Sequence, residues 1–234
     1  MHRPRLLHEI LYELIASMVF TIKFDSVDLI SEGEYQLNNV CDMHHVHPGE
    51  KMIIDGATYK VKDYNLADNT IRLLGDAEIT ATSTNLSLPN FFHGTPMAEE
   101  NDLVKTPMVD KTPMIYLMEP YEITIDDSSL SAIDRRCNVK ICFLTESDPT
   151  NWRTDDFYHN AITPMKNLME DMVEKIISSG LFYTDKLKIK TVNYTNFGIR
   201  IPDYGTKKLY FSEKLSGVMA EMTLEIYKEE SCDC

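Results

Sequence analysis

The sequence predicts an α+β fold: a mostly antiparallel sheet covered by two main helices, with a small all-β, barrel-like insert and an extended proline-rich arm. Three observations predict this class. Two segments have apolar residues at helical spacing, several short segments have an apolar residue at every second position, and one irregular stretch contains three Thr-Pro-Met units. We expect four parts in the 234 residues. They are 1–32, the N-terminal helix and strand of the core; 33–82, the β insert; 83–113, the extended arm or loop; and 114–234, the α+β core.

The first predicted element is an amphipathic helix over residues 5–17. Its apolar residues form one stripe, on the side opposite Glu9 and Glu13. The stripe consists of Leu6, Leu7, Ile10, Leu11, Leu14 and Ile15. From Met18 to Phe24 every second residue is apolar, and this period predicts a strand.

The predicted β insert consists of short strands between tight turns, from about Tyr35 to Thr80. Asp55-Gly56 is the strongest hairpin signal in the chain, because both residue types tolerate the positive φ of a two-residue turn. His47-Pro48-Gly49-Glu50 marks another turn. Short strands at this spacing predict a small curled sheet or barrel.

The predicted core combines four strands with a second main helix. The strands are Met114–Met118, Arg136–Leu144, Leu187–Val192 and Leu215–Tyr227. The helix is predicted to begin with Thr163 as N-cap and Pro164 at the first helical position, and to end at Gly180. Cys137 and Cys142, five residues apart on one strand, should point to opposite faces and remain reduced thiols.

The charge of the chain excludes some classes of function. A net charge of −14 argues against a tight nucleic-acid binder, which needs a basic surface. An acidic surface is compatible with double-stranded DNA passing along it without sequence-specific binding.

No apolar run is long enough to span a bilayer, and Glu9 and Glu13 interrupt the stretch that a secretion signal would need. We expect no membrane partner.

The segment from Cys41 to His47 is the sharpest candidate for a chemical site. On a strand, His45 and His47 would share one face and could bind one metal ion, with His44 beside them. No second ligand pair of recognisable spacing occurs elsewhere in the sequence. Exposed histidines at the end of a strand are therefore the preferred interpretation.

The sequence contains no recognisable set of catalytic residues. It has neither a phosphate-binding glycine loop nor a Gly-x-Ser-x-Gly motif. His93 could act as a general base, but no nucleophile is placed for it by the sequence. We expect no catalytic residue, no cofactor, no metal and no enzymatic activity.

Residues 90–111 are predicted to form an intersubunit arm. Their prolines favour an extended path, and their apolar residues need a surface to cover. A long irregular segment of this kind is usually functional or binds a partner. The expected interface residues are Phe91, Phe92, His93, Gly94, Thr95, Pro96, Met97, Pro107 and Met108.

Five short motifs between residues 90 and 168 carry a resemblance. They are Phe92-His93-Gly94-Thr95-Pro96, residues 111–120 (Lys-Thr-Pro-Met-Ile-Tyr-Leu-Met-Glu-Pro), Arg135-Arg136-Cys137, Asn151-Trp152 and Ile162–Leu168. As a set they resemble virion proteins of tailed bacteriophages, of the neck or tail-completion type, most like those of crAss-like phages of Bacteroidota.

This resemblance implies a structural protein that forms a homo-oligomeric ring at the head-to-tail junction. Its partners would be a portal or adaptor and tail proteins, and it would reside in the virion after assembly in the host cytoplasm. Two alternatives from other classes stay open. One is a metal-dependent enzyme using His45, His47 and His93, and the other is an adaptor that binds peptides through the β insert.

Overall fold

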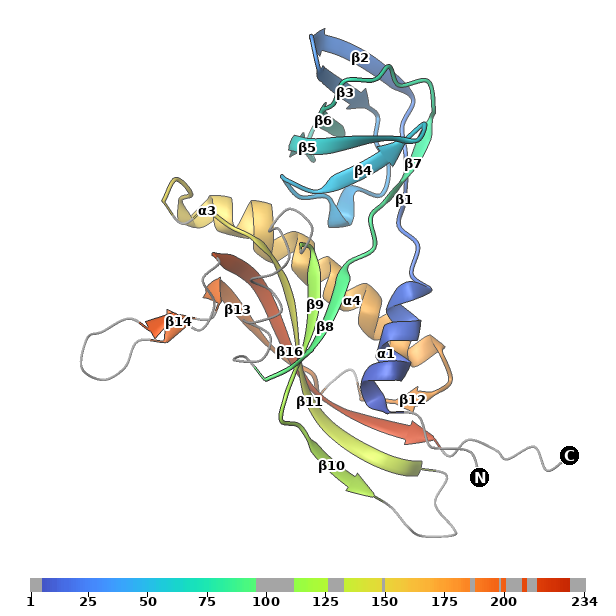
Figure 1. The fold of residues 1–234 in the computed structure, drawn as a ribbon, viewed down its shortest axis with the longest axis vertical. Coiled ribbons are helices and arrows are strands. Elements are labelled where there is room, and N and C mark those ends of the chain that lie inside the picture. The colour runs from blue at the N-terminus through green and yellow to red at the C-terminus, as the bar shows by residue number, and fades with distance from the viewer. Residues whose placement is uncertain are drawn as a thin grey trace, which may run out of the picture.

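The computed structural model describes residues 6–95, 112–125, 133–148, 150–185, 188–197, 199–200, 208–209 and 214–227. The described chain forms two seven-stranded sheets and one small two-stranded sheet. Figure 1 shows the first sheet at the top, above a long helix that runs along one side of the second sheet.

The predicted fold class is wrong. Strands make up 49% of the structure, and its described part has only one main helix, over residues 154–178, besides a short one. The short helix, α1 (Leu7–Ala16), buries the predicted apolar stripe. It has only 10 residues, however, and it contacts the main helix and one edge strand. The second sheet is therefore covered by one main helix with the short α1 beside it, not by two main helices, and the fold is mostly β.

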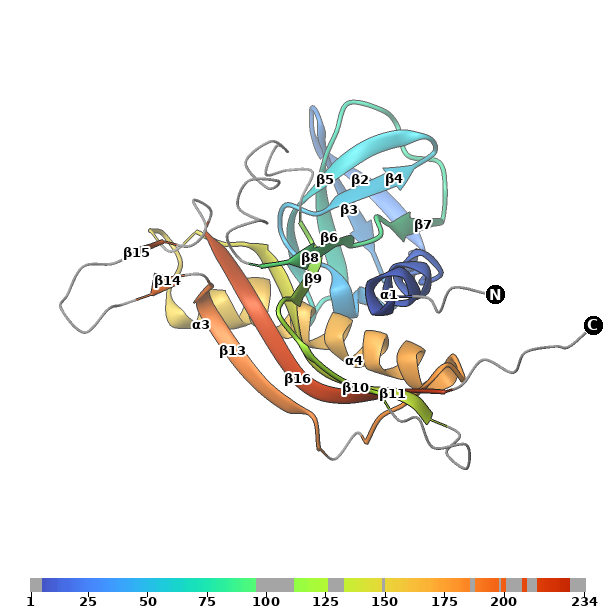
Figure 2. The same ribbon diagram turned by 60° about the horizontal axis from the view of Figure 1, so that its bottom comes forward.

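The first sheet is built from residues 21–86. Its strands are β1 (Thr21–Lys23), β2 (Ser26–Ser31), β3 (Glu34–Asn38), β4 (Lys51–Ile54), β5 (Ala57–Asn65), β6 (Thr70–Leu74) and β7 (Ser83–Leu86). They are ordered β1-β7-β4-β5-β6-β3-β2. Because only Phe24 and Asp25 separate the two end strands, the sheet curls round into a small barrel (Figure 2). The strand expected in the core from Met18 onward thus belongs to this barrel.

The barrel has its own apolar core, with fully buried side chains such as Leu37, Met52 and Tyr59. The predicted hairpin at Asp55-Gly56 is confirmed. Both residues have positive φ, 52° and 80°, and Ile54 pairs with Ala57 across the turn. These are the dihedral signs of a type I′ turn, whose twist matches that of the two strands.

The second sheet contains most of the remaining strands. They are β8 (Asn90–Gly94), β9 (Met114–Met118), β10 (Glu122–Ile125), β11 (Ile133–Glu146), β12 (Phe182–Tyr183), β13 (Lys190–Phe197) and β16 (Leu215–Tyr227). The small separate sheet consists of β14 (Ile199–Arg200) and β15 (Lys208–Leu209). β11 pairs with β16 along its whole length, and the other strands flank these two. The predicted strands Met114–Met118 and Leu215–Tyr227 are confirmed.

The main helix begins nine residues before the predicted N-cap. Its parts are α3 (Thr154–Phe157), the π-helical turn η3 (Tyr158–Ile162) and α4 (Thr163–Ser178). Asp156 caps the start by accepting a hydrogen bond from the Arg153 backbone nitrogen at 2.7 Å. Pro164 lacks an N–H, and the wider π turn before it accommodates this loss inside a continuous helix. The predicted end is confirmed, because Gly180 adopts a φ of 70°.

The two faces of the second sheet are both apolar near its middle. One face packs against α1 and α4 and includes Cys137, Ile141 and Phe143. The opposite face carries a smaller cluster that includes Tyr116 and Cys142. The prediction that Cys137 and Cys142 point to opposite faces is therefore confirmed, and both are buried as free thiols.

The predicted arm does not begin at Asn90. Residues 90–94 form β8, which pairs in parallel with β9 of the same chain. The Tyr116 hydroxyl donates a hydrogen bond to the Gly94 carbonyl oxygen at 2.9 Å, which fixes the end of this strand. Residues 96–111 lie outside the described residues. In the described part of the chain, no helix is long and apolar enough to cross a membrane.

Gly217 lets the two central strands lie close together. A Cβ atom at this position would overlap the backbone carbonyl of Phe143 on β11. We predict that Gly217→Ala lowers the free energy of unfolding by about 3 kcal/mol or more, because backbone on both strands must move. Gly180→Ala is the control, since its Cβ would meet nothing and only its positive φ costs about 1 kcal/mol. Equal effects of the two variants in urea unfolding would contradict this explanation.

Candidate functional site at the contact between the two sheets

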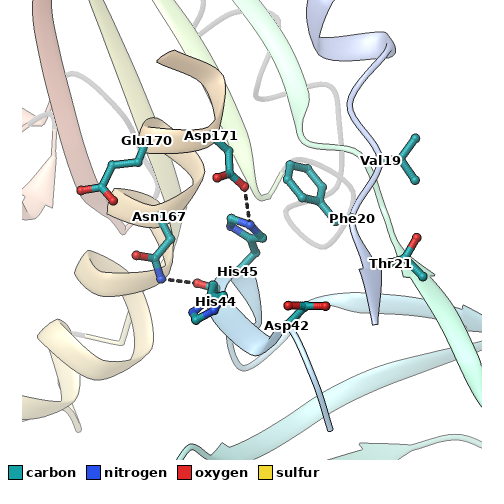
Figure 3. Close-up of a pocket in the computed structure, with 9 residues that line it drawn as sticks. All are labelled: Val19, Phe20, Thr21, Asp42, His44, His45, Asn167, Glu170 and Asp171. Carbon is teal, nitrogen blue, oxygen red and sulfur yellow. Dashed lines mark hydrogen bonds and ion pairs between the residues drawn. The ribbon is translucent and has the colours of Figure 1, made fainter. Parts of the chain in front are cut away.

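A pocket of about 460 Å³ lies where the barrel meets α4. It is lined by Val19, Phe20, Thr21, Asp42, His44, His45, Asn167, Glu170 and Asp171. Figure 3 shows that the two histidines come from the barrel side and that the amide and two carboxylates come from α4. The lining therefore joins residues that are more than a hundred positions apart in the sequence.

The histidine segment is not a strand, so the preferred interpretation of exposed histidines at a strand end is wrong: His44 is exposed, but His45 is half-buried and His47 is buried. The alternative of His45 and His47 sharing one strand face does not hold either. Asp42 has a left-handed φ of 62°, which turns the chain into the short 3₁₀ helix η1 (Met43–His45). His45 and His47 consequently reach different partners. No group of three metal-binding side chains occurs among the residues that the structure describes.

His45 is held between the two parts of the molecule. Its Nε2 atom lies 2.6 Å from a carboxylate oxygen of Asp171 on α4 (Figure 3). Its ring packs at 4.5 Å on Phe20, and its Nδ1 atom is buried without a hydrogen-bond partner. Burial lowers the pKa of His45, against the opposing effect of Asp171. The arrangement favours a neutral ring that donates Nε2–H to the carboxylate.

Two further contacts cross the same boundary. The Asn167 side-chain amide donates a hydrogen bond to the His44 carbonyl oxygen. The Tyr64 hydroxyl of the barrel donates to the His159 carbonyl oxygen on η3, and the two rings stack with centroids 4.5 Å apart. These contacts bind backbone groups that would otherwise need water, so they fix the barrel against the helix.

His47 and Glu50 form a fully buried polar pair beside this boundary, each only 2% exposed. His47 Nδ1 donates to the Pro48 carbonyl oxygen at 3.1 Å and lies 3.3 Å from the hydroxyl of Thr145 on β11. Burial lowers the pKa of His47 to about 4 and raises the pKa of Glu50 well above its ordinary value. Burial thus favours the neutral form of both groups, and the 4.0 Å separation of His47 Nε2 from the Glu50 carboxyl oxygen is too long for a hydrogen bond.

The chemistry available here is that of a structural contact. A histidine–carboxylate pair can activate a nucleophile, but the buried Nδ1 atom of His45 faces no hydroxyl or thiol within hydrogen-bond distance in the described residues. His93 lies elsewhere, on β8, where it contacts Glu119 at 3.3 Å and stacks on His8. The structure does not bring His45, His47 and His93 together.

The predicted interface residues divide into two groups. Phe91, Phe92, His93 and Gly94 lie on β8, and Thr95 follows it. Phe91 packs on the core beneath the helices and Phe92 on the opposite cluster, so both contribute to the chain's own sheet. The remaining ones, Pro96, Met97, Pro107 and Met108, lie outside the described residues.

The residues that hold the barrel in place were missed by the sequence analysis. Asn167 and Asp171 sit on the polar side of an amphipathic helix and give the same signal as solvated residues. Tyr64 and Thr145 are residue types that are common in strands, so their identity gave no signal of a contact across this boundary. Comparison with protein-family models, with curated proteins and with solved structures gave no match. The functional interpretation therefore depends on this chain's own residues.

The buried Glu50 gives a pH-dependent prediction. Burial raises the pKa of Glu50 in the folded state. The free energy of unfolding therefore falls as the pH rises above the ordinary pKa near 4.5, because the unfolded chain loses this proton and the folded protein keeps it. Glu50→Gln removes this cost and keeps an acceptor for the His47 backbone N–H. We predict that the variant is more stable than the wild type at pH 8, by a margin that grows about 1.4 kcal/mol per pH unit up to the folded-state pKa.

Urea unfolding at several pH values measures this margin. Glu32→Gln is the matched control, because it neutralises an exposed carboxylate of the same barrel. A wild type as stable as Glu50→Gln at pH 8 would show that Glu50 is not held neutral.

Proposed function

We propose that this protein is a structural virion protein that forms a ring at the head-to-tail junction of a tailed phage, in the neck or at tail completion. Neighbouring copies, a portal or adaptor, and tail proteins are its partners in this proposal. The location comes from the resemblance of the motifs between residues 90 and 168. The assembly role is supported by one structural observation: two edge strands that expose large aliphatic side chains.

The first of these strands is β2, at the end of the barrel sheet. Among the described residues it pairs only with β3. Leu29 is 65% exposed and Ile30 is 49% exposed. The pairing of β2 with β3 is irregular at Ile30, between Leu29 and Ser31, and both aliphatic side chains are exposed at this outer edge of the sheet. Its one charged residue, Asp28, accepts a hydrogen bond from Asn38 at 2.8 Å.

The second strand is β10, at the side of the second sheet. It pairs with β11, and the described chain places no strand on its other side. Ile123 is 47% exposed and Ile125 is 70% exposed. Proteins that remain monomeric usually protect such edges with charges, bulges or covering segments. β2 has an irregular register and one charge, whereas β10 pairs with β11 in unbroken register. The exposed aliphatic side chains on both edges, and on β10 above all, favour a subunit that pairs with other chains.

The acidic balance of the chain agrees with this role. A net charge of −14 repels phosphates, so a ring of such subunits can let double-stranded DNA pass without holding it. Tight binding would need many lysines and arginines arranged along the DNA path.

The mass of the purified protein in solution tests the proposal, alone and mixed with portal, adaptor and tail proteins. We expect a closed oligomer or a stable complex with one of these partners. A strict monomer in every combination would overturn the proposed function.

The predicted arm provides a separate test. We propose replacing residues 97–110 by a Gly-Ser linker of about eight residues, which can reach about 26 Å and so can still join β8 to β9. The shortened protein should fold with unchanged thermal stability but assemble more weakly, because an intersubunit contact is lost. A Gly-Ser linker of the original length is the control, because it separates the effect of losing the arm's sequence from the effect of shortening the segment. Wild-type assembly by both variants would show that the arm is not an intersubunit contact.

A further inference from the structure

We infer that adjacent copies join through opposite edges of the second sheet, with β10 of one copy pairing antiparallel to β13 of the next. In this contact Ile123 and Ile125 enter a groove between α4 and β13 of the neighbour. The inference rests on the proposed function, because it names the contact that joins one ring subunit to the next.

The strand directions allow this pairing. β10 pairs with β11, β11 with β16 and β16 with β13, and each of these three pairs is antiparallel (Figure 2). β10 and β13 therefore run in opposite directions. Within the described residues, β10 pairs only with β11 and β13 only with β16. Copies related by rotation about an axis along the strands would continue the same antiparallel alternation.

The exposed isoleucines lie on the helix side of the sheet. Ile123 is directly opposite Cys137, which belongs to the core beneath α1 and α4. Ile125 is two residues further along the strand, so it points to the same side. Both side chains remain largely exposed, which shows that the helices do not cover β10.

The groove lies on the same side, at the other edge of the sheet. It has a volume of about 340 Å³ and runs between α4 and the start of β13. Met169 and Val173 line it from the helix, and Ile189 and Thr191 line it from the strand side. Thr191 is opposite Ala220, another residue of the core beneath the helices. The other lining residues are the charged Lys166, Glu170 and Glu174 of α4. A neighbour's isoleucines would thus meet Met169, Val173 and Ile189 without crossing the sheet.

The two edges are offset along the strand direction. Through β11, β10 lies level with Thr223–Ile226 of β16, whereas β13 lies level with Leu215–Glu221. An offset of about six residues is about 20 Å along the strand, and four strands are about 19 Å wide. A closed ring must then tilt its strands by about 45°, close to the 35–45° typical of closed barrels. The offset is thus compatible with a closed assembly.

Cross-linking between two different variants tests the contact directly. In a background with Cys41, Cys232 and Cys234 changed to serine, we would mix Ile125→Cys with Thr191→Cys and add a short bis-maleimide. The expected result is a cross-linked dimer in the mixture that neither variant gives alone. The pair Ile53→Cys with Thr191→Cys is the control, because Ile53 is an exposed isoleucine on the barrel. Equal cross-linking of both pairs would overturn the inference.

Charge insertion separates this contact from ring formation as such. We expect Ile125→Asp to weaken the affinity of self-association at least tenfold, whereas Ile53→Asp should assemble like the wild type. The thermal stability of both variants should be unchanged. If the wild type assembles and Ile125→Asp assembles equally well, this contact is wrong and the proposed function stands. If the wild type never assembles, alone or with virion proteins, both the contact and the proposed function fail.

Discussion

The antiparallel pairing of β11 with β16 is the interaction on which the rest of the structure depends. It runs from Ile133 opposite Tyr227 to Glu146 opposite Leu215. Every other strand of the second sheet joins directly to one of these two, except β8, which is attached through β9. The main helix packs on one face of the pair, and a smaller apolar cluster lies on the other. The strands that flank this pair include β10 and β13, whose outer edges pair with no other described strand and are where a neighbouring chain can add strands.

The barrel is attached to this framework by specific polar contacts more than by a shared core. Phe20 is the one described side chain that packs against both large apolar clusters. The contact of His45 with Asp171 and that of Tyr64 with the His159 carbonyl fix its position on the helix. Hydrogen bonds need defined distances and angles, so contacts of this kind set an orientation that apolar packing alone would leave loose. A fixed barrel holds the open edge of β2 at a defined place relative to β10.

Local signals in the sequence predicted much of the fold, and long-range contacts account for what it did not predict. Asp55-Gly56 and Gly180 have conformations that few other residues adopt, so the turn and the helix end could be recognised. Thr163-Pro164 has the local pattern of a helix start, yet the helix continues through it because α3 and η3 precede it. The partners of the histidines could not be predicted, because Asp171 on a helix looks like any solvated carboxylate. The barrel and the helix are far apart in the sequence and come into contact only in the folded structure.

The central claim is that the sheet edges of this subunit pair with neighbouring chains. Backbone hydrogen exchange of the wild-type protein, compared between dilute monomer and assembled oligomer, tests it most directly. The account predicts that amides of β10 and β13 exchange more slowly in the oligomer, while those of β5 inside the barrel stay the same. Unchanged exchange of β10 and β13 in an assembled oligomer would contradict it.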